Sequence, residues 1–349
     1  MSEFDSYRPP SSPRRKRRRQ GPRRAGRNQG GHREAPVVPE AEFTSYYGRP
    51  IVKPAPWEDD VAVYLFLGGL SAGSALLAAG GQLTGNSILR RNCRYASLAA
   101  AGLGTVALIK DLGRPERFLN MLRTFKVTSP MSVGSWILVT FSTGAGLAVV
   151  GEVLKLRFMA NASGLLAGAL APALAAYTAV LLTNTATPTW FGARDYLPFV
   201  FTGSAAMAAG GLAAVMTPIA NSRPARNLAM VGVAIELIAS EVMERSMDET
   251  EAEPLRTGQP GRLMSLSKTL AVVGGATTAV AAFAAKRGWR SARAIAGIGG
   301  LSLVASSALN RFGVFRAGME SAKDPRYTVE PQKRRLEERG GGNSITTIS

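Results

Sequence analysis

The chain has 349 residues and a net charge of +18, but apolar stretches of about 20 residues recur along it, and no soluble globular fold accommodates them. It has one cysteine, Cys93, and one histidine, His32. A single cysteine excludes a disulfide within the chain. One cysteine and one histidine are also too few ligands for a haem, an iron–sulfur cluster or a structural zinc ion. We therefore expect an all-α, polytopic membrane protein with no haem, no iron–sulfur cluster and no metal in this chain.

Residues 1–56 are expected to form a disordered basic tail, because arginine, glycine and proline dominate them. The basic run from Arg14 to Arg24 is compatible with nucleic-acid binding, but no folded nucleic-acid module accompanies it. Contact with lipid headgroups or with a partner is the alternative. No apolar region follows the run until Val61, so it does not have the pattern of a signal peptide. We expect no nucleic-acid partner.

Eight transmembrane helices are expected in the apolar middle of the chain. A segment of about 20 residues spans a hydrocarbon core of roughly 30 Å at the helical rise of 1.5 Å per residue. The expected spans are residues 61–83, 95–109, 133–154, 162–182, 197–217, 228–242, 270–285 and 294–309. Small residues recur in these spans and favour close helix packing in lipid. A polar tail is expected at 319–349.

The loop charges predict the orientation in the cell membrane. Eight spans place both termini on one face, together with the longer loops 110–132, 183–196 and 243–269. The opposite face has short loops that carry arginine and lysine and no acidic residue. Short basic loops favour the cytoplasm. Both termini are therefore expected on the extracytoplasmic side, although the polybasic tail favours the reverse.

The loop after the second expected span has an unusual density of charge. Lys110 and Asp111 lie at the membrane boundary, where they could neutralise each other. The charged and apolar residues that follow alternate, which favours a partner-docking surface over a solvated loop with weak ion pairs. The candidate docking residues are Arg114, Glu116, Arg117, Phe118 and Arg123.

Glu236 lies about halfway along the sixth expected span. An ionisable group at that depth is costly, and it suggests a functional role by default. Proton transfer is one role, and a protonated or hydrogen-bonded carboxyl group that fixes helix packing is the other. The sequence does not separate them.

Three segments resemble the NrfD/PsrC family, the membrane subunits of polysulfide reductase and related molybdopterin oxidoreductases. They are DLGRPERFLNMLRTFKVTSPMSVGSW at 111–136, WEDDVAVYLFLGGLSAG at 57–73 and AYTAVLLTNTATPTW at 176–190. The resemblance covers about residues 57–330. It implies eight helices in two four-helix bundles, here 57–190 and 191–318, with menaquinone or ubiquinone bound in the first. It also implies an iron–sulfur, ferredoxin-like partner subunit and a molybdopterin catalytic subunit.

The resemblance also implies site residues. Tyr177 matches a family tyrosine that hydrogen-bonds a quinone carbonyl, and Tyr64 stands where at least one relative has histidine. Asp60, one turn before Tyr64, could take up or pass on a proton, and Lys110 and Asp111 could relay it. The alternative for both tyrosines is interfacial aromatic packing.

The resemblance thus predicts the quinone-reactive membrane anchor of an oxidoreductase complex, with formate or a sulfur compound as the substrate of the complex by analogy. A transporter or proton channel would also explain eight spans and Glu236, but broken helices in matching halves are lacking. A passive anchor would explain the docking loop but not Tyr177.

Overall fold

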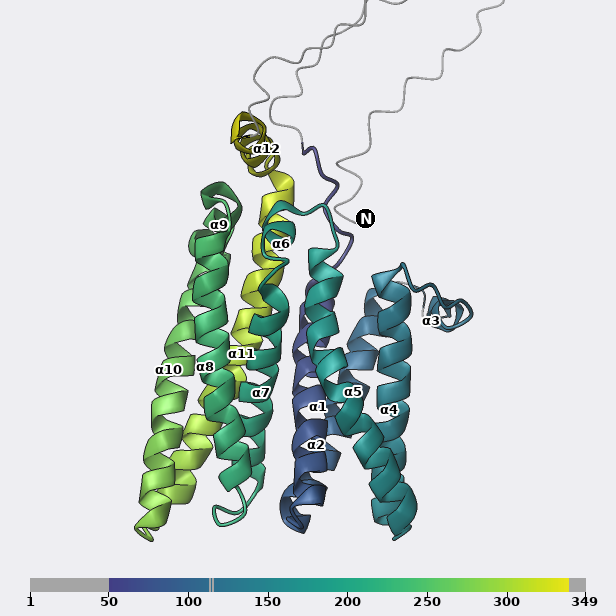
Figure 1. The fold of residues 1–349 in the computed structure, drawn as a ribbon, viewed down its shortest axis with the longest axis vertical. Coiled ribbons are helices and arrows are strands. Elements are labelled where there is room, and N and C mark those ends of the chain that lie inside the picture. Colours follow the sequence, from purple (N-terminus) through teal and green to yellow (C-terminus); the bar gives the residue numbers. More distant parts are fainter. Residues whose placement is uncertain (1–49, 113, 115, 339–349) are drawn as a thin grey trace, which may run out of the picture. The chain divides into compact units, whose positions relative to one another are not determined.

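Every secondary-structure element that the computed structural model assigns within residues 50–112, 114 and 116–338 is helical; the side chains of Arg117 and Leu119 are not described. The long helices are α1 (Asp59–Leu83), α2 (Ser87–Asp111), α4 (Pro130–Val153), α5 (Arg157–Thr183), α7 (Leu197–Met216), α8 (Arg223–Ser246), α10 (Gly258–Lys286) and α11 (Ala292–Lys323). The shorter helices are α3 (Arg117–Met121), α6 (Pro188–Gly192), α9 (Glu249–Arg256) and α12 (Arg326–Glu338) (Figure 1). The predicted all-α class is confirmed.

In the part of the chain that the structure describes, six helices are long and apolar enough to cross a membrane. They are α1, α4, α5, α7, α10 and α11. The protein is therefore a multi-pass membrane protein. The expected spans 95–109 and 228–242 are helical as parts of α2 and α8, but these two helices lack a stretch as long and as apolar as the six have.

Local sequence signals fix where several helices begin and end. The Asn86 side chain accepts a hydrogen bond of 3.2 Å from the Leu89 N–H and so caps α2. Ser129 caps α4 in the same way, with Pro130 in the first turn, where a missing N–H costs nothing. Gly85, with φ of 71°, ends α1 in the left-handed region that glycine tolerates.

Each long helix packs against several others. α1 contacts α2 and α5, and α4 contacts the same two helices. Similarly, α7 and α10 each contact α8 and α11, while α7 also contacts α1 and α5. The expected small residues make this packing close. A Cβ added to Gly73 on α1 would lie 2.6 Å from the carbonyl oxygen of Ala205 on α7, so the backbones of α1 and α7 meet there without side chains between them.

Side-chain contacts between distant chain segments define two ends of this helical unit. At one end the Asn86 side chain donates to the backbone carbonyl of Asn221, and Gln82 donates to the carbonyl of Asn161. At the other end Trp57 stacks on Trp190, with ring centroids 5.9 Å apart. We call these the Asn86 end and the Trp57 end. α6, α9 and α12 lie at the Trp57 end (Figure 1).

The two expected tails have different outcomes. Of the basic tail predicted for 1–56, residues 1–49 lie outside the described residues, as does His32. Of the polar tail predicted for 319–349, the structure describes residues up to 338. They hold the end of α11 and the whole of α12, so this stretch is largely helical.

Candidate functional site

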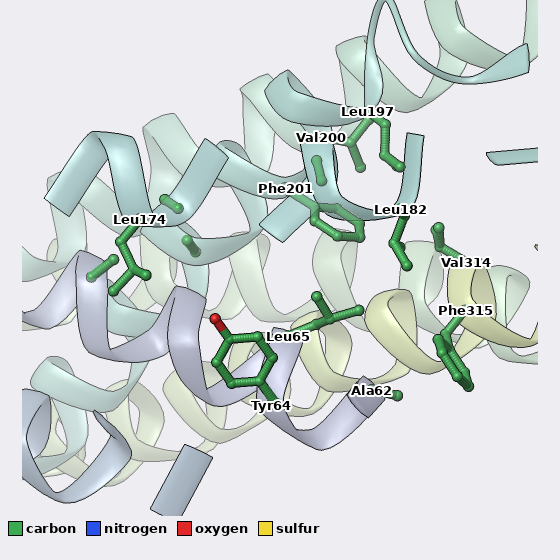
Figure 2. Packing of buried hydrophobic residues seen from close by; sticks show 14 of the residues in the cluster. Ala62, Tyr64, Leu65, Leu174, Leu182, Leu197, Val200, Phe201, Val314 and Phe315 are labelled. Atoms are coloured by element: carbon green, nitrogen blue, oxygen red, sulfur yellow. The ribbon is translucent and has the colours of Figure 1, made fainter. Parts of the chain in front are cut away.

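Tyr64 lies within α1, and its side chain is only 2% exposed. Its ring faces α2, because a Cβ added to Gly104 would lie 3.7 Å from ring atom Cδ2 of Tyr64. Apolar side chains surround this region: Figure 2 shows Leu174 of α5 and Phe201 of α7 in the same buried cluster. A phenol hydroxyl is therefore placed in an apolar region, where a hydrogen bond gains strength.

Tyr177 lies on α5, is 8% exposed, and packs against α4. A Cβ added to Gly134 of α4 would come within 1.6 Å of the ring carbon Cζ and 2.0 Å of the hydroxyl oxygen of Tyr177. No side chain can therefore occupy position 134 while the Tyr177 ring keeps its place. The missing side chain at Gly134 positions the phenol.

The structure brings the two predicted quinone-binding tyrosines together. The phenol groups of Tyr64 and Tyr177 lie close enough to interact electrostatically, because α1 and α5 pack against each other. Phenol hydroxyls donate hydrogen bonds, and a quinone offers two carbonyl acceptors on an apolar ring. The donors and the apolar surroundings of the pair therefore fit the chemistry of a quinone head group.

Asp60 pairs with Lys110, across α1 and α2. Nζ of Lys110 lies 3.0 Å from Oδ2 of Asp60 and donates a 3.2 Å hydrogen bond to Oδ1. The prediction that Lys110 would neutralise its neighbour Asp111 is wrong. Residues adjacent on a helix point about 100° apart, so the side chains of Lys110 and Asp111 reach different partners near the start of α1.

Asp111 instead accepts a hydrogen bond of 3.1 Å from the backbone N–H of Glu58, just before α1. Burial raises the pKa of the Asp111 carboxyl group, while this N–H donor partly opposes the shift. The hydrogen bond with Asp60, and the charge of Asp60, raise the pKa of the Lys110 amino group. These candidate proton-transfer groups therefore meet at the start of α1, one turn from Tyr64.

A second set of contacts at the start of α1 was not predicted. Arg316 of α11 binds both carboxylate oxygens of Asp59, at 2.6 Å and 3.2 Å. Beside it, Trp190 lies between Trp57 and Phe315, with centroids 5.9 Å and 5.7 Å away. The eighth span was expected to end at residue 309, so Arg316 and Phe315 were left outside it. The absence of proline between residue 309 and Pro325 was the signal that α11 continues.

The predicted docking residues lie in the connection between α2 and α4. The side chains of Arg114, Glu116 and Arg123 are exposed, and that of Phe118 is half-buried. The side chain of Arg117 lies outside the described residues. Apolar side chains that are also exposed follow in the same connection and at the start of α4: Phe125, Val127 and Met131. The surface thus combines charge with exposed apolar groups.

Glu236 does not join the tyrosines. It lies on α8, is 3% exposed, and has Asn310 and Arg311 of α11 beside it. The structure therefore separates the predicted proton-transfer residues into two places: Asp60, Lys110 and Asp111 near the start of α1, and Glu236 among α7, α8 and α11.

A cavity of about 250 Å³ lies at the Trp57 end between α6, α9 and α12, and neither Tyr64 nor Tyr177 lines it. Its lining includes Glu251 of α9, which pairs with Arg335 of α12. Burial raises the pKa of the Glu251 carboxyl group, and the Arg335 charge opposes the rise. Within the described residues, no group of three or more His, Cys, Asp or Glu side chains is arranged to hold a metal ion.

Comparison with known proteins identifies the chain by its sequence profile. The profile of the family described as "Polysulphide reductase, NrfD" matches residues 51–243, which include α1 to α7 and most of α8. The match thus contains both tyrosines, the Asp60–Lys110 pair and the docking connection. No curated protein matches the chain.

Proposed function

Because the chain belongs to the NrfD polysulphide reductase family, we propose that it is the quinone-reactive membrane subunit of a molybdopterin oxidoreductase complex. In this role it exchanges electrons between the membrane quinone pool and an iron–sulfur partner subunit. The observation that supports the proposal is that two buried phenols, Tyr64 on α1 and Tyr177 on α5, lie near each other in an apolar part of the membrane region. A passive anchor has no need of such a pair.

The proposed quinone site lies between α1, α4 and α5. Tyr177 donates a hydrogen bond to one quinone carbonyl, held in position by contact with Gly134. Tyr64 supplies a second hydroxyl from α1, and the surrounding apolar side chains exclude water. Bound quinone, either menaquinone or ubiquinone, supplies the redox chemistry by gaining or losing two electrons and two protons.

Proton exchange with the outside is proposed for the groups at the start of α1. Asp60 lies one turn from Tyr64 and is the acceptor or donor nearest to the phenols along α1. The Lys110 amino group, largely exposed, holds Asp60 by an ion pair and connects it to the surface. Asp111 lies on the same turn of α2 and completes the relay.

The partner is proposed to dock on the connection between α2 and α4, through Arg114, Glu116, Arg117, Phe118 and Arg123. This placement follows from distance, because electron transfer needs a cluster near the quinone. The connection leaves α2 next to Lys110 and enters α4 just before Gly134. The ferredoxin-like subunit would pass electrons to a molybdopterin subunit, with formate or a sulfur compound as its substrate. The chain itself is proposed to hold no haem, iron–sulfur cluster or metal.

The proposal includes eight transmembrane helices, with α2 and α8 added to the six most apolar ones. Two four-helix bundles are proposed, α1, α2, α4 and α5 in one and α7, α8, α10 and α11 in the other. The contacts of α1 and α4 with α2 and α5, and those of α7 and α10 with α8 and α11, support this division. Both termini are proposed to be extracytoplasmic, since the Asn86 end carries short basic connections.

Quinol oxidation by membranes from strains with and without this chain tests the proposal. The complex should oxidise a short-chain quinol only when the chain is present and assembled, as judged by reduction of the partner's clusters. Equal quinol-dependent rates in both strains would overturn it. If the chain were a transporter, its removal would leave reduction of the clusters by quinol unchanged. If it were a passive anchor, its removal would abolish cluster reduction only by releasing the partner from the membrane.

A further inference from the structure

Arg311 is a fully buried cation inside α11, with 0% of its surface exposed. Its Nη2 donates a 2.6 Å hydrogen bond to the carbonyl of Phe201 on α7. Its guanidinium carbon lies 3.6 Å from the centroid of the Phe201 ring, a cation–π contact. An arginine stays charged in proteins, so this part of the molecule holds a fixed positive charge.

The Glu236 carboxyl group faces this cation from α8. Arg311 acts on it electrostatically, and the neighbouring Asn310 side chain lies within reach of a hydrogen bond to it. Among the other charged groups near α8, Lys268 of α10 and Arg256 of α9 bind Glu244 instead. Within the described residues, Arg311 is therefore the charge that compensates Glu236.

The protein leaves several polar atoms of this cluster without a partner. The unpaired acceptors are Oε2 of Glu236 and Oδ1 of Asn310, and the unpaired donors are Nε and Nη1 of Arg311. Each lost hydrogen bond in an apolar interior is costly, so buried polar groups of this kind are normally satisfied by water. A water molecule donates two hydrogen bonds and accepts two, which matches two acceptors and two donors.

A polar line on α8 connects the cluster to the Trp57 end. Glu236, Ser240 and Glu244 are spaced by four residues and so lie on one face of the helix. Ser240 and Glu244 are both buried. Glu244 binds Lys268 at 2.6 Å and Arg256 at 3.3 Å, and both of these cations reach the surface.

We propose that Glu236, Asn310 and Arg311 form a water-binding site in which the Glu236 carboxylate takes up and releases a proton, with access from the Trp57 end along Ser240 and Glu244. The step is a simple protonation of a carboxylate to a carboxylic acid, carried by water, and it involves no electron transfer. Arg311 keeps its proton throughout and stabilises the ionised state of Glu236.

The inference does not depend on the proposed quinone function, because the isolated chain suffices to test it. α1 links this site to the tyrosines: a Cβ added to Gly69 would lie 3.0 Å from Nη2 of Arg311. The helix that carries Tyr64 and Asp60 therefore also forms one wall of this site.

Infrared difference spectroscopy of the full chain in lipid nanodiscs tests the proposal during a pH titration. A carboxylic-acid C=O band should appear as the pH falls, and it should shift when D₂O replaces H₂O. The band should be lost in Glu236→Gln, which keeps the size of the side chain. It should persist in Glu241→Gln, the control, because Glu241 is exposed on the same helix and pairs with Arg245.

Two further variants test the surroundings of the carboxyl group. Asn310→Leu removes one partner of Glu236 without changing a charge, so the band should shift. Ser240→Val should slow the exchange of the band in D₂O, since it blocks the line to Glu244. A band unaffected by Glu236→Gln, no band at any pH, or a band that never exchanges with D₂O would each overturn the proposal.

Discussion

The ring of Tyr177 occupies the space that a side chain at position 134 would need: a Cβ there would lie 1.6 Å from the Tyr177 ring carbon Cζ. The contact joins α5 to α4 at the depth where the connection after α2 enters the helical unit. The position of a hydrogen-bond donor is thus set by the lack of a side chain on the facing helix.

Gly134→Ala should therefore displace Tyr177 and weaken quinol binding, with an added cost to stability of about 1–3 kcal/mol from overpacking. Gly146→Ala on the same helix is the matched control, since its nearest neighbour atom would be 4.0 Å away. Thermal unfolding and quinol kinetics of the assembled complex measure both effects. Equal behaviour of the two alanine variants would contradict the positioning role of Gly134.

The two adjacent carboxylates at the start of α1 should behave differently. Asp60→Asn removes the proposed proton acceptor beside Tyr64 and should slow turnover more than it weakens quinol binding. Asp59→Asn breaks the pair with Arg316, an exposed ion pair expected to contribute about 0–1 kcal/mol, and should leave turnover near the wild-type value. Steady-state kinetics at varied quinol concentration separate the two parameters. A larger loss of turnover in Asp59→Asn would argue against a proton role for Asp60.

The docking connection can be tested by charge reversal. Arg114→Glu with Arg117→Glu should release the iron–sulfur subunit, because the introduced glutamates would repel the acidic groups of the partner that the arginines bind. Arg245→Glu with Arg262→Glu makes the same charge change on the exposed surface of α8 and α10 and should leave the complex intact. Co-purification measures both, and retention of the partner by the first double variant would place the interface elsewhere.

The orientation of the chain gives a fourth prediction. A reporter that works only in the cytoplasm should be silent when fused after Ser349, and the same reporter inserted at Gly288, in the connection between α10 and α11, should be active. This result follows from the short basic connections at the Asn86 end. An active reporter at Ser349 would mean that one of α2 and α8 does not cross the membrane or that the tail charges decide the orientation.

The sequence predicted the apolar helices well and the polar contacts poorly, for physical reasons. The spans expected at 61–83 and 197–217 agree closely with α1 and α7, because hydropathy directly reflects burial in lipid. α11 continues far beyond the expected end at 309, since Asn310 and Arg311 lower hydropathy without breaking a helix. Hydropathy predicts which part of a helix contacts lipid, but it does not predict where the helical backbone hydrogen bonds stop.

The residues of the candidate site were likewise predicted from the sequence, whereas their contacts were not. Tyr64, Tyr177 and Asp60 were predicted from the family resemblance, and the structure places the two phenols together. The pairing of Asp60 with Lys110, and the contact of Tyr177 with Gly134, depend on how far α1, α2, α4 and α5 slide along one another. A sequence without a structure contains no measure of that register, so Lys110 was paired with its neighbour in the chain.

The most direct test of the quinone proposal is the quinol kinetics of the assembled complex carrying Tyr177→Phe, alone and together with Tyr64→Phe. Loss of a hydrogen bond worth about 0.5–1.5 kcal/mol should lower the apparent quinol affinity by up to about tenfold in Tyr177→Phe. The double variant should lose more, while the partner's clusters still exchange electrons with one another. Unchanged quinol kinetics in the double variant would contradict a quinone site at these two tyrosines.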